Sequence, residues 1–446
     1  MLGDWGSADW GKNKNNWIKF VRMKVKMQKN TTRRKVLKGA GAVAAYAGLG
    51  LGMPNVVRAN DKVVRYLGTA TTMGSEIDKK LFEDTGIKVQ YIPVTTDEVT
   101  KRVLTQPNSF DIVDTEYFSL PKLVPSGNIL GMDSKRIKNF DNISTTHTLG
   151  EIGGKKIGDQ GTAPKKVFYL KDESSKEFSS EPTRWATLIP TVFNADTLGI
   201  RPDLIGRPIN TWAELLNPEF KGKASILNIP SIGIMDAAMV VESMGEYKYP
   251  DKGNMTRKEI DMTIGILIEA KKQGQFRALW SDFNESVNLM ASGEVVIQSM
   301  WSPAITAVRT QGIPCIYQPL KEGYRAWAVG FALSAATKGY QADVCYEFIN
   351  WYLSGFVGGH LNRQGYYSAV PSTAKEYMAA YEWDYWMLGK PATQDIMAPD
   401  GKKLAGAGEV RDGGSFEERM GGVACWNATM DENRYMVRKW NEFVAA

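Results

Sequence analysis

Short apolar runs alternate with amphipathic segments along the chain from Val63 onward. Apolar residues at helical spacing predict helices, and apolar runs or strict alternation predict strands. The pattern gives, in order, a strand at Val63–Leu67, a helix at Glu76–Asp84, a strand at Ile87–Tyr91, a helix opened by the capping box Thr95-x-x-Glu98, and a strand at Phe110–Val113. This alternation is typical of βαβ units, so we predict a mostly parallel sheet flanked by helices.

The same alternation returns in the second half of the chain. A further capping box, Thr256-x-x-Glu259, predicts a helix that ends at Lys272. The other predicted elements are a helix capped by Thr211 and Glu214 that ends at Leu216, strands at Ala224–Leu227, Glu294–Met300 and Ile316–Tyr317, and helices at Ile234–Met244, Phe283–Ser292, Ser302–Gln311, Ala342–Leu353 and Glu432–Val444. Between the halves, Asn142–Ser180 is polar with weak periodicity, and we predict surface loops there.

Two apolar segments that carry tryptophan, Arg184–Phe193 and Arg325–Leu333, interrupt the alternation. We interpret them as crossings between two domains, because a chain of this length is expected to form about two at roughly 100–200 residues each. The predicted organisation is residues 60–188 with 326–372 as lobe 1, and residues 189–325 with 373–446 as lobe 2.

The N-terminal segment has the three parts of an export signal. Arg33 and Arg34 precede an uncharged run, Gly39–Met53, and the segment ends at the small-residue site Val57-Arg58-Ala59. The paired arginines indicate the twin-arginine route, so residues 1–59 are predicted to be an extension and signal peptide that engage the twin-arginine translocase and are removed after Ala59. We therefore predict a periplasmic protein.

Removal of this segment changes the charge of the chain. It takes 12 of 55 Lys and Arg residues and 2 of 49 Asp and Glu residues, so the net charge changes from +6 to −4. The remaining chain gives no reason to expect nucleic acid as a partner.

The chemistry-bearing residues do not form a known catalytic motif. The chain after Ala59 lacks G-x-S-x-G, H-E-x-x-H, a phosphate loop and C-x-x-C, and its two histidines, His147 and His360, are far apart. We predict no catalytic residues, metal ligands or cofactor. Three cysteines are present, Cys315, Cys345 and Cys425, which leaves open one disulfide with a free thiol or three buried thiols.

Several short segments, in their order and spacing, resemble the extracellular solute-binding proteins of ABC importers, and most closely the polyamine (spermidine/putrescine)-binding branch. These segments are Phe82–Val89, Phe110–Val113, Thr211–Leu215, Pro218–Gly222, Ser292–Val295, Met300–Ser302 and Gly365–Pro371. The resemblance covers nearly all of the chain after the signal. It implies a monomer with two α/β lobes of the type II-like arrangement, joined by crossing hinge segments, that closes on a small ligand and delivers it to a permease in the inner membrane.

By family position, ten residues at strand ends and crossings are expected in the cleft: Thr69, Glu116, Tyr117, Phe118, Trp185, Ser231, Trp301, Trp327, Tyr366 and Tyr367. Aromatic walls exclude water and hold a cation over a ring face, while hydroxyls and a carboxylate fix its orientation. We predict that Trp301 and Trp327 face each other across the cleft and that Glu116 pairs with one cationic nitrogen.

The chain departs from the polyamine pattern at two positions. Ile229-Pro230-Ser231 and Val329 stand where that branch is expected to have carboxylates. Arg184 and Arg325 lie beside the crossing tryptophans, either to meet an anionic group or as solvated hinge charges. A ligand with a single amine, or a zwitterion such as an amino-acid derivative, fits better than a di- or tri-cation. The alternatives are a ferric-ion or other metal-binding import protein that uses Tyr366 and Tyr367, and a secreted hydrolase.

Overall fold

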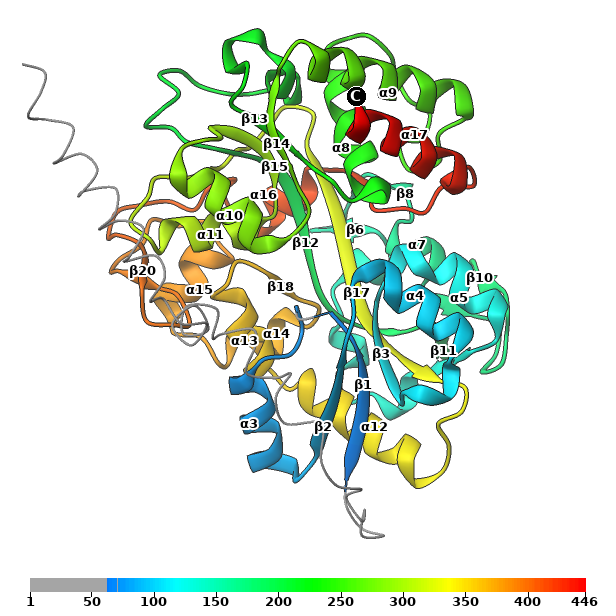
Figure 1. The fold of residues 1–446 in the computed structure, drawn as a ribbon. Coiled ribbons are helices and arrows are strands. Elements are labelled where there is room, and N and C mark those ends of the chain that lie inside the picture. Colours follow the sequence, from blue (N-terminus) through cyan, green and yellow to red (C-terminus); the bar gives the residue numbers. More distant parts are fainter. Residues whose placement is uncertain (1–61, 70) are drawn as a thin grey trace, which may run out of the picture. The chain divides into compact units, whose positions relative to one another are not determined.

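One 13-stranded mixed sheet runs through the part of the chain that the computed structural model describes, residues 62–69 and 71–446 (Figure 1). The predicted twin-arginine signal and its cleavage site after Ala59 lie outside the described residues. The main strands are, in spatial order, β14 (Phe276–Trp280), β13 (Ala224–Leu227), β15 (Ile297–Met300), β12 (Ile189–Ile200), β17 (Tyr324–Ser334), β3 (Ile112–Glu116), β1 (Val63–Gly68) and β2 (Lys88–Pro93). Lys62–Ala446 form one compact unit.

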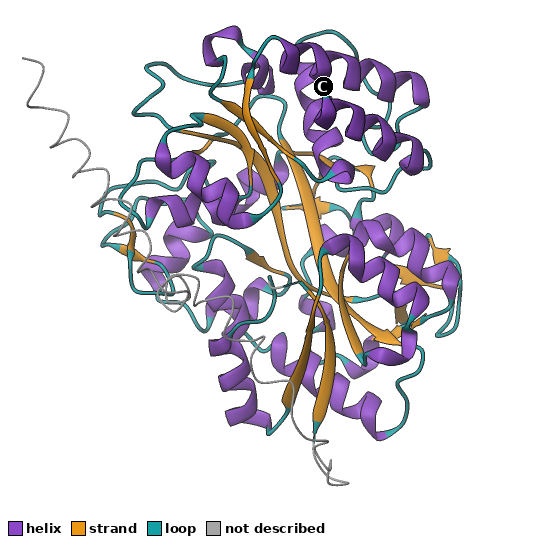
Figure 2. Ribbon diagram, viewed as in Figure 1, coloured by secondary structure: helices purple, strands orange, loops and turns teal. Residues whose placement is uncertain are grey.

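Each end of this sheet is the core of one lobe. β2, β1 and β3 are parallel in the first lobe, and β14, β13 and β15 are parallel in the second. Helices cover both sides of the sheet in each lobe (Figure 2). The predicted fold class, two α/β lobes with mixed and mostly parallel sheets, is confirmed.

Two long strands, β12 and β17, join the lobes. They pair antiparallel along their middle, with Asn194 opposite Trp327 and Asp196 opposite Arg325. β12 then pairs with β15 in the second lobe, and β17 pairs with β3 in the first lobe. Both strands are buried almost throughout, which explains their long apolar sequences.

The first crossing starts later than the sequence predicted. Arg184 and Trp185 precede β12, and Trp185 belongs to the short strand β11 (Trp185–Ala186) of a separate four-stranded sheet. Arg184 there forms an ion pair with Asp133, with Nε at 2.7 Å from Oδ1. The apolar pattern of this stretch is explained by two successive strands rather than one.

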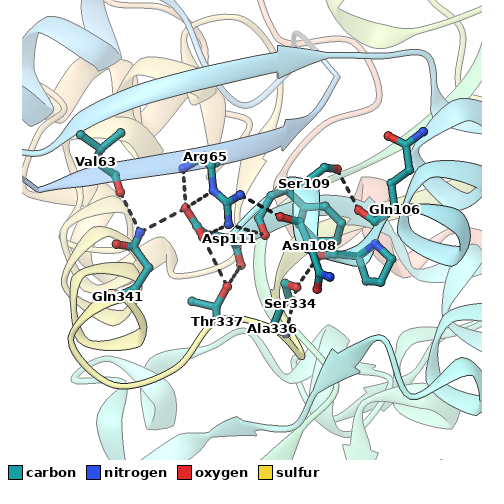
Figure 3. A network of polar contacts seen from close by, with 12 residues as sticks. Val63, Arg65, Gln106, Asn108, Ser109, Asp111, Ser334, Ala336, Thr337 and Gln341 are labelled. Carbon is teal, nitrogen blue, oxygen red and sulfur yellow. Dashed lines mark hydrogen bonds and ion pairs between the residues drawn. The ribbon is translucent and has the colours of Figure 1, made fainter. Parts of the chain in front are cut away.

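The N-terminal end of β1 is fixed by a network around Asp111, which is almost fully buried. Figure 3 shows its carboxylate facing Arg65, Thr337 and Gln341. Arg65 donates to it from the backbone N at 2.8 Å and from Nη2 at 2.6 Å, and Gln341 Nε2 donates to it at 3.1 Å. This network joins β1, the start of β3 and the helix α12 (Tyr340–Tyr352), which packs on β1.

In the first lobe, α3 (Ser75–Thr85) and α4 (Thr96–Thr105) connect the parallel strands as predicted. Thr95 and Glu98 form the predicted capping box of α4. The second lobe contains α8 (Pro230–Ser243), α9 (Arg257–Lys272), α10 (Phe283–Ser292), α11 (Ser302–Arg309) and the C-terminal α17 (Asn433–Ala445).

The C-terminal helix α17 packs tightly onto α8 and α9. Trp440 Nε1 donates to Asn228 Oδ1 at 2.8 Å, and its ring covers Gly233 of α8. A Cβ atom at Gly233 would lie 2.4 Å from this ring, so only glycine allows the two helices to approach so closely. The contact fixes the loop after β13, where the cleft residue Ser231 was predicted.

Two local predictions are wrong. Asn142–Ser180 contains short elements such as α6 (Thr145–Thr148) and α7 (Pro164–Val167), and its Phe168 is fully buried. The segment after Thr211 is a 3₁₀-helix, Trp212–Leu216, in which Glu214 pairs with Arg207 instead of closing a capping box. Burial in the tertiary structure decides the first case, and the ion pair with Arg207 decides the second. The three cysteines are buried free thiols.

We expect Thr256→Ala to lower the free energy of unfolding by about 1 kcal/mol, because it removes the N-cap of α9. Thr256 Oγ1 lies 2.8 Å from Glu259 Oε2, and the Thr256 backbone N donates to the same carboxylate at 2.7 Å. Thr105→Ala is the control, since that exposed hydroxyl donates to the Lys101 carbonyl of its own helix. Urea unfolding measures both, and equal losses would contradict the assignment.

Candidate solute-binding cleft

The carboxyl ends of the parallel strands of both lobes lead toward the crossing strands. β3 ends at Glu116, β13 leads through a short loop to Ser231, and β15 is followed by Trp301. Ligands of open α/β sheets bind beyond the carboxyl ends of strands, so this is the expected place for a site.

A chain of polar contacts connects the two lobes at this point. Asn427 Nδ2 donates to Glu116 Oε2 at 3.0 Å, and Arg325 Nη1 donates to Asn427 Oδ1 at 2.7 Å. Arg325 Nε then donates to Asp236 Oδ1 at 2.6 Å, and its Nη2 lies 3.2 Å from Asp196 Oδ2. Arg325 is only 1% exposed, so it is a buried ion-pair partner and not a solvated hinge charge.

Carboxyl groups exceed cations in this cluster. Asp196 and Asp236 contact the guanidinium of Arg325 directly, and Glu116 is linked to it through Asn427. Burial raises the pKa of Glu116 to about 7, against the opposing effects of the Asn427 hydrogen bond and the Arg325 charge. Burial also raises the pKa of Asp196 to about 7. When all three are ionised, the cluster carries excess negative charge, which a cation from outside can neutralise.

A groove of about 320 Å³ brings two predicted residues to the same surface. Phe118 contributes from the first lobe and Ser231 from the start of α8 in the second. Ser231 is 8% exposed, and its hydroxyl has no hydrogen-bond partner within the described residues. Lys101 of α4 and Asn433 of α17 complete opposite sides of the groove.

The predicted tryptophans pack against different aromatic rings. The Trp301 and Trp280 ring centroids are 4.8 Å apart at 89°. The Trp327 and Tyr366 centroids are 5.8 Å apart at 77°. Both tryptophans are partly exposed, and these edge-to-face contacts fix their ring planes. That they face each other across a ligand stays a prediction.

Three other predicted residues contact groups outside the polar cluster. Tyr117 is buried and stacks on His147. Tyr367 is fully buried, and its hydroxyl accepts a hydrogen bond from Arg411 Nη1 at 2.8 Å. Trp185 lies in β11 beside Arg184. Thr69 directly follows β1, and its hydroxyl lies 3.3 Å from that of Thr71.

The sequence interpretation missed three members of the cluster: Asp196, Asp236 and Asn427. Asp196 stands in a strand that is otherwise largely apolar, and Asp236 in a largely apolar helix. A single carboxylate in such a run needs a buried partner, so this signal was present in the sequence. Asn427 follows β21 (Val423–Trp426) and had no comparable signal.

A family model described as bacterial extracellular solute-binding protein matches residues 76–355. The chain belongs to this family. Among the described residues of this solute-binding protein, no helix is long and apolar enough to cross a membrane. Family membership places its action outside the cytoplasm, as an exported protein of an ABC import system.

Solved solute-binding proteins share the fold. The spermidine/putrescine ABC transporter substrate-binding protein PotD of Streptococcus pneumoniae, solved with calcium and HEPES, has a TM-score of 0.57 at 13% identity, with 86% of this chain and 98% of that chain covered. The TpPotD lipoprotein of Treponema pallidum has a TM-score of 0.61 at 12% identity and 85% and 99% coverage.

A third structure, the PBP AgtB from A. tumefaciens R10 in complex with agropinic acid, has a TM-score of 0.53 at 14% identity and covers 86% of this chain and 99% of its own. No curated protein matches this chain in sequence. At these identities the comparison supports the two-lobed fold. It does not identify the ligand of this chain.

Proposed function

We propose that the protein is the periplasmic substrate-binding component of an ABC importer, and that it captures a small organic solute with one cationic nitrogen. The observation that carries this proposal is the excess of buried carboxyl groups over cations around Arg325. Glu116 is the member of the cluster that is partly exposed, so it is the one that reaches a solute. The bound solute then passes to a permease in the inner membrane.

In this proposal Glu116 pairs with the nitrogen, and aromatic rings enclose the rest of the solute. Trp301, Trp327 and Tyr366 are partly exposed and lie at a strand end, on the crossing strand and beside it. Phe118, Ser231 and Thr69 complete the site. Tyr117, Trp185 and Tyr367 act through packing in this arrangement, since two of them are buried in the core and one is in β11.

A zwitterionic amino-acid derivative is the second candidate, and Ser231 is the observation that favours it. Its unpartnered hydroxyl lies at the N-terminus of α8, where a helix dipole attracts negative charge. A solute with an amine and a carboxylate would use Glu116 and Ser231 together. AgtB, which shares the fold, was solved with agropinic acid, and PotD is named for spermidine and putrescine.

Thermal unfolding against a panel of mono-amines, di-amines, amino acids and simple carboxylates tests the proposal. A ligand at 100 times its dissociation constant stabilises the folded protein by about 2.7 kcal/mol, which is easily measured. Amines and zwitterions are expected to raise Tm and carboxylates without nitrogen to leave it unchanged. Stabilisation by carboxylates alone would overturn the proposal.

Two alternatives have their own tests. A ferric-binding protein that used Tyr366 and Tyr367 would show a visible tyrosinate–iron absorption band on addition of Fe³⁺. The two rings have different surroundings, since Tyr366 contacts Trp327 and Tyr367 contacts Arg411. A secreted hydrolase would consume the solute, whereas we expect the bound solute to be recovered unchanged.

The affinity for a cationic solute is expected to fall on acidification. Glu116 must be ionised to pair with nitrogen, and its pKa is about 7 in the ligand-free site. Binding should therefore be tighter at about pH 8 than at about pH 6 and should release protons. Calorimetric titration in buffers of different ionisation enthalpy measures this release. Proton uptake, or no pH dependence, would contradict the role of Glu116.

We also propose export by the twin-arginine route and the lobe boundaries 60–188 with 326–372 and 189–325 with 373–446. N-terminal sequencing of the protein from the cell envelope is expected to begin at Asn60. Replacement of Arg33 and Arg34 by lysine should leave the precursor in the cytoplasm. Normal export of that variant would exclude the twin-arginine route.

A further inference from the structure

A small cavity beside α11 is lined by an excess of arginine. Its volume is about 20 Å³, and Arg309, Arg411 and Arg419 line it together with a single acidic residue, Asp412. Arg411 and Arg419 are 4% and 2% exposed. Two guanidiniums buried this deeply are costly unless counter-charges accompany them.

Among the described residues, Asp412 is the only acidic residue of the lining, and it already has partners. Asp412 Oδ2 lies 3.0 Å from Arg309 Nη2 and accepts a hydrogen bond from the Tyr317 backbone N at 2.9 Å. Within residues 62–69 and 71–446, no ion pair joins Arg411 or Arg419 to a carboxylate. The two guanidiniums therefore leave an uncompensated positive charge in the interior.

Four donor atoms around the cavity also have no acceptor in the described structure: Arg411 Nε and Nη2, Arg419 Nε and Trp386 Nε1. All three residues line the same cavity. Two other donors are used, since Arg411 Nη1 donates to the Tyr367 hydroxyl and Arg419 Nη2 donates to Ser302 Oγ at 3.1 Å. Buried N–H groups almost always have partners, so a cluster of unpaired ones indicates a missing acceptor.

The surrounding side chains hold both guanidiniums in place. Arg419 lies 3.8 Å from the centre of the Tyr317 ring, and Arg411 lies between the rings of Tyr367 and Trp386 at 4.9 and 4.8 Å. Gly413 has φ of 74°, and a Cβ atom there would lie 2.9 Å from Arg419 Cγ. The loop thus needs glycine to admit the arginine.

We propose that this cavity is a structural binding site for one monatomic anion of the halide class, held by Arg411, Arg419 and Trp386. A water needs roughly 10–15 Å³, so the cavity of about 20 Å³ has room for one particle of about that size. Water would accept the hydrogen bonds but would leave the positive charge uncompensated. The site explains why Tyr367 is buried and lies outside the proposed solute site.

The anion also has a mechanical consequence for the cleft. Ser302, which accepts from Arg419, follows Trp301 directly, and Tyr367, which accepts from Arg411, follows Tyr366. A filled cavity would fix the two segments that carry the partly exposed rings of Trp301 and Tyr366. Because the anion site is separate from the cleft, the test of the anion site does not depend on the identity of the proposed solute.

The purified protein should show a Tm that rises with chloride or bromide and saturates, when ionic strength is kept constant with gluconate. Arg411→Met should lose this dependence. Arg363→Met is the matched control, because Arg363 pairs with Glu382 and does not line the cavity. This variant should be less stable than the parent but should keep the dependence of Tm on halide.

Crystals of the parent protein soaked in bromide give a test that does not depend on any variant folding. An anomalous peak in the cavity, within hydrogen-bond distance of Arg411 and Arg419, is the expected result. Bromide at surface sites only, together with equal Tm in chloride and gluconate, would overturn the proposal. Retention of the halide dependence in folded Arg411→Met would overturn it as well.

Discussion

Arg325→Met is expected to lower the free energy of unfolding by about 3–5 kcal/mol, because it leaves two buried carboxylates without their counter-charge. Arg325 and both carboxylates, Asp196 and Asp236, are at most 1% exposed. Methionine fills a similar volume but offers neither charge nor donors, and Asn427 loses its partner too. Urea unfolding at neutral pH gives the change in free energy.

Arg184→Met is the matched control for this experiment. Arg184 also pairs with a buried carboxylate, Asp133, but the Arg184 side chain is 48% exposed. Water can replace much of what the arginine supplied, so the loss is expected to be much smaller than in Arg325→Met. Equal losses of unfolding free energy in the two variants would show that the buried cluster contributes no more stability than the partly exposed Arg184–Asp133 pair.

A second change separates charge from packing. Asp236→Asn in the Arg325→Met background removes one of the two buried carboxylates that lack a counter-charge. The double variant should therefore recover part of the lost stability. The loss in Arg325→Met should also shrink on acidification, because the carboxyl groups then bind protons. Absence of both effects would show that Arg325 stabilises through volume alone.

Local sequence signals predicted much of the fold. The capping boxes at Thr95 and Thr256 involve residues three apart, so the chain alone determines them. Glu116 was instead expected in the cleft from the family resemblance, and it stands at the carboxyl end of β3. Tertiary contacts decided the remainder, as in the burial of Phe168 within a stretch without periodicity.

The candidate site was harder to predict because its residues meet from distant parts of the chain. Arg325 contacts Asp236 and Asn427, which lie 89 and 102 residues away, and no spacing rule connects them. Tyr366 and Tyr367 are neighbours in sequence but contact Trp327 and Arg411, respectively. A motif could identify the pair of tyrosines but not which one stays partly exposed and which one is buried.

Glu116→Gln is expected to weaken binding of the solute identified by the panel by about 2–5 kcal/mol, the typical cost of removing one partner of a desolvated charge pair. Glutamine keeps the shape of the side chain and an oxygen that accepts from Asn427 Nδ2, so the polar chain to Arg325 can persist. Only the charge opposite the solute nitrogen is lost. Calorimetric titration gives the change in affinity.

The folded protein should tolerate this change, and the sign of the pKa shift explains why. Burial raises the pKa of Glu116 from 4.5 to about 7, so ionisation of Glu116 in the ligand-free protein opposes folding as pH rises through that range. Glutamine removes this cost, and the stability of the ligand-free variant at about pH 8 should equal or exceed that of the parent.

Asp111→Asn provides the matched control at the other end of the same strand. Asp111 is a buried carboxylate that holds Arg65 and Gln341 far from the cluster around Arg325 (Figure 3). Its replacement should lower stability and leave affinity unchanged, the opposite of the result for Glu116→Gln. If Glu116→Gln binds the solute as tightly as the parent, the cationic nitrogen is bound elsewhere and the assignment of Glu116 is wrong.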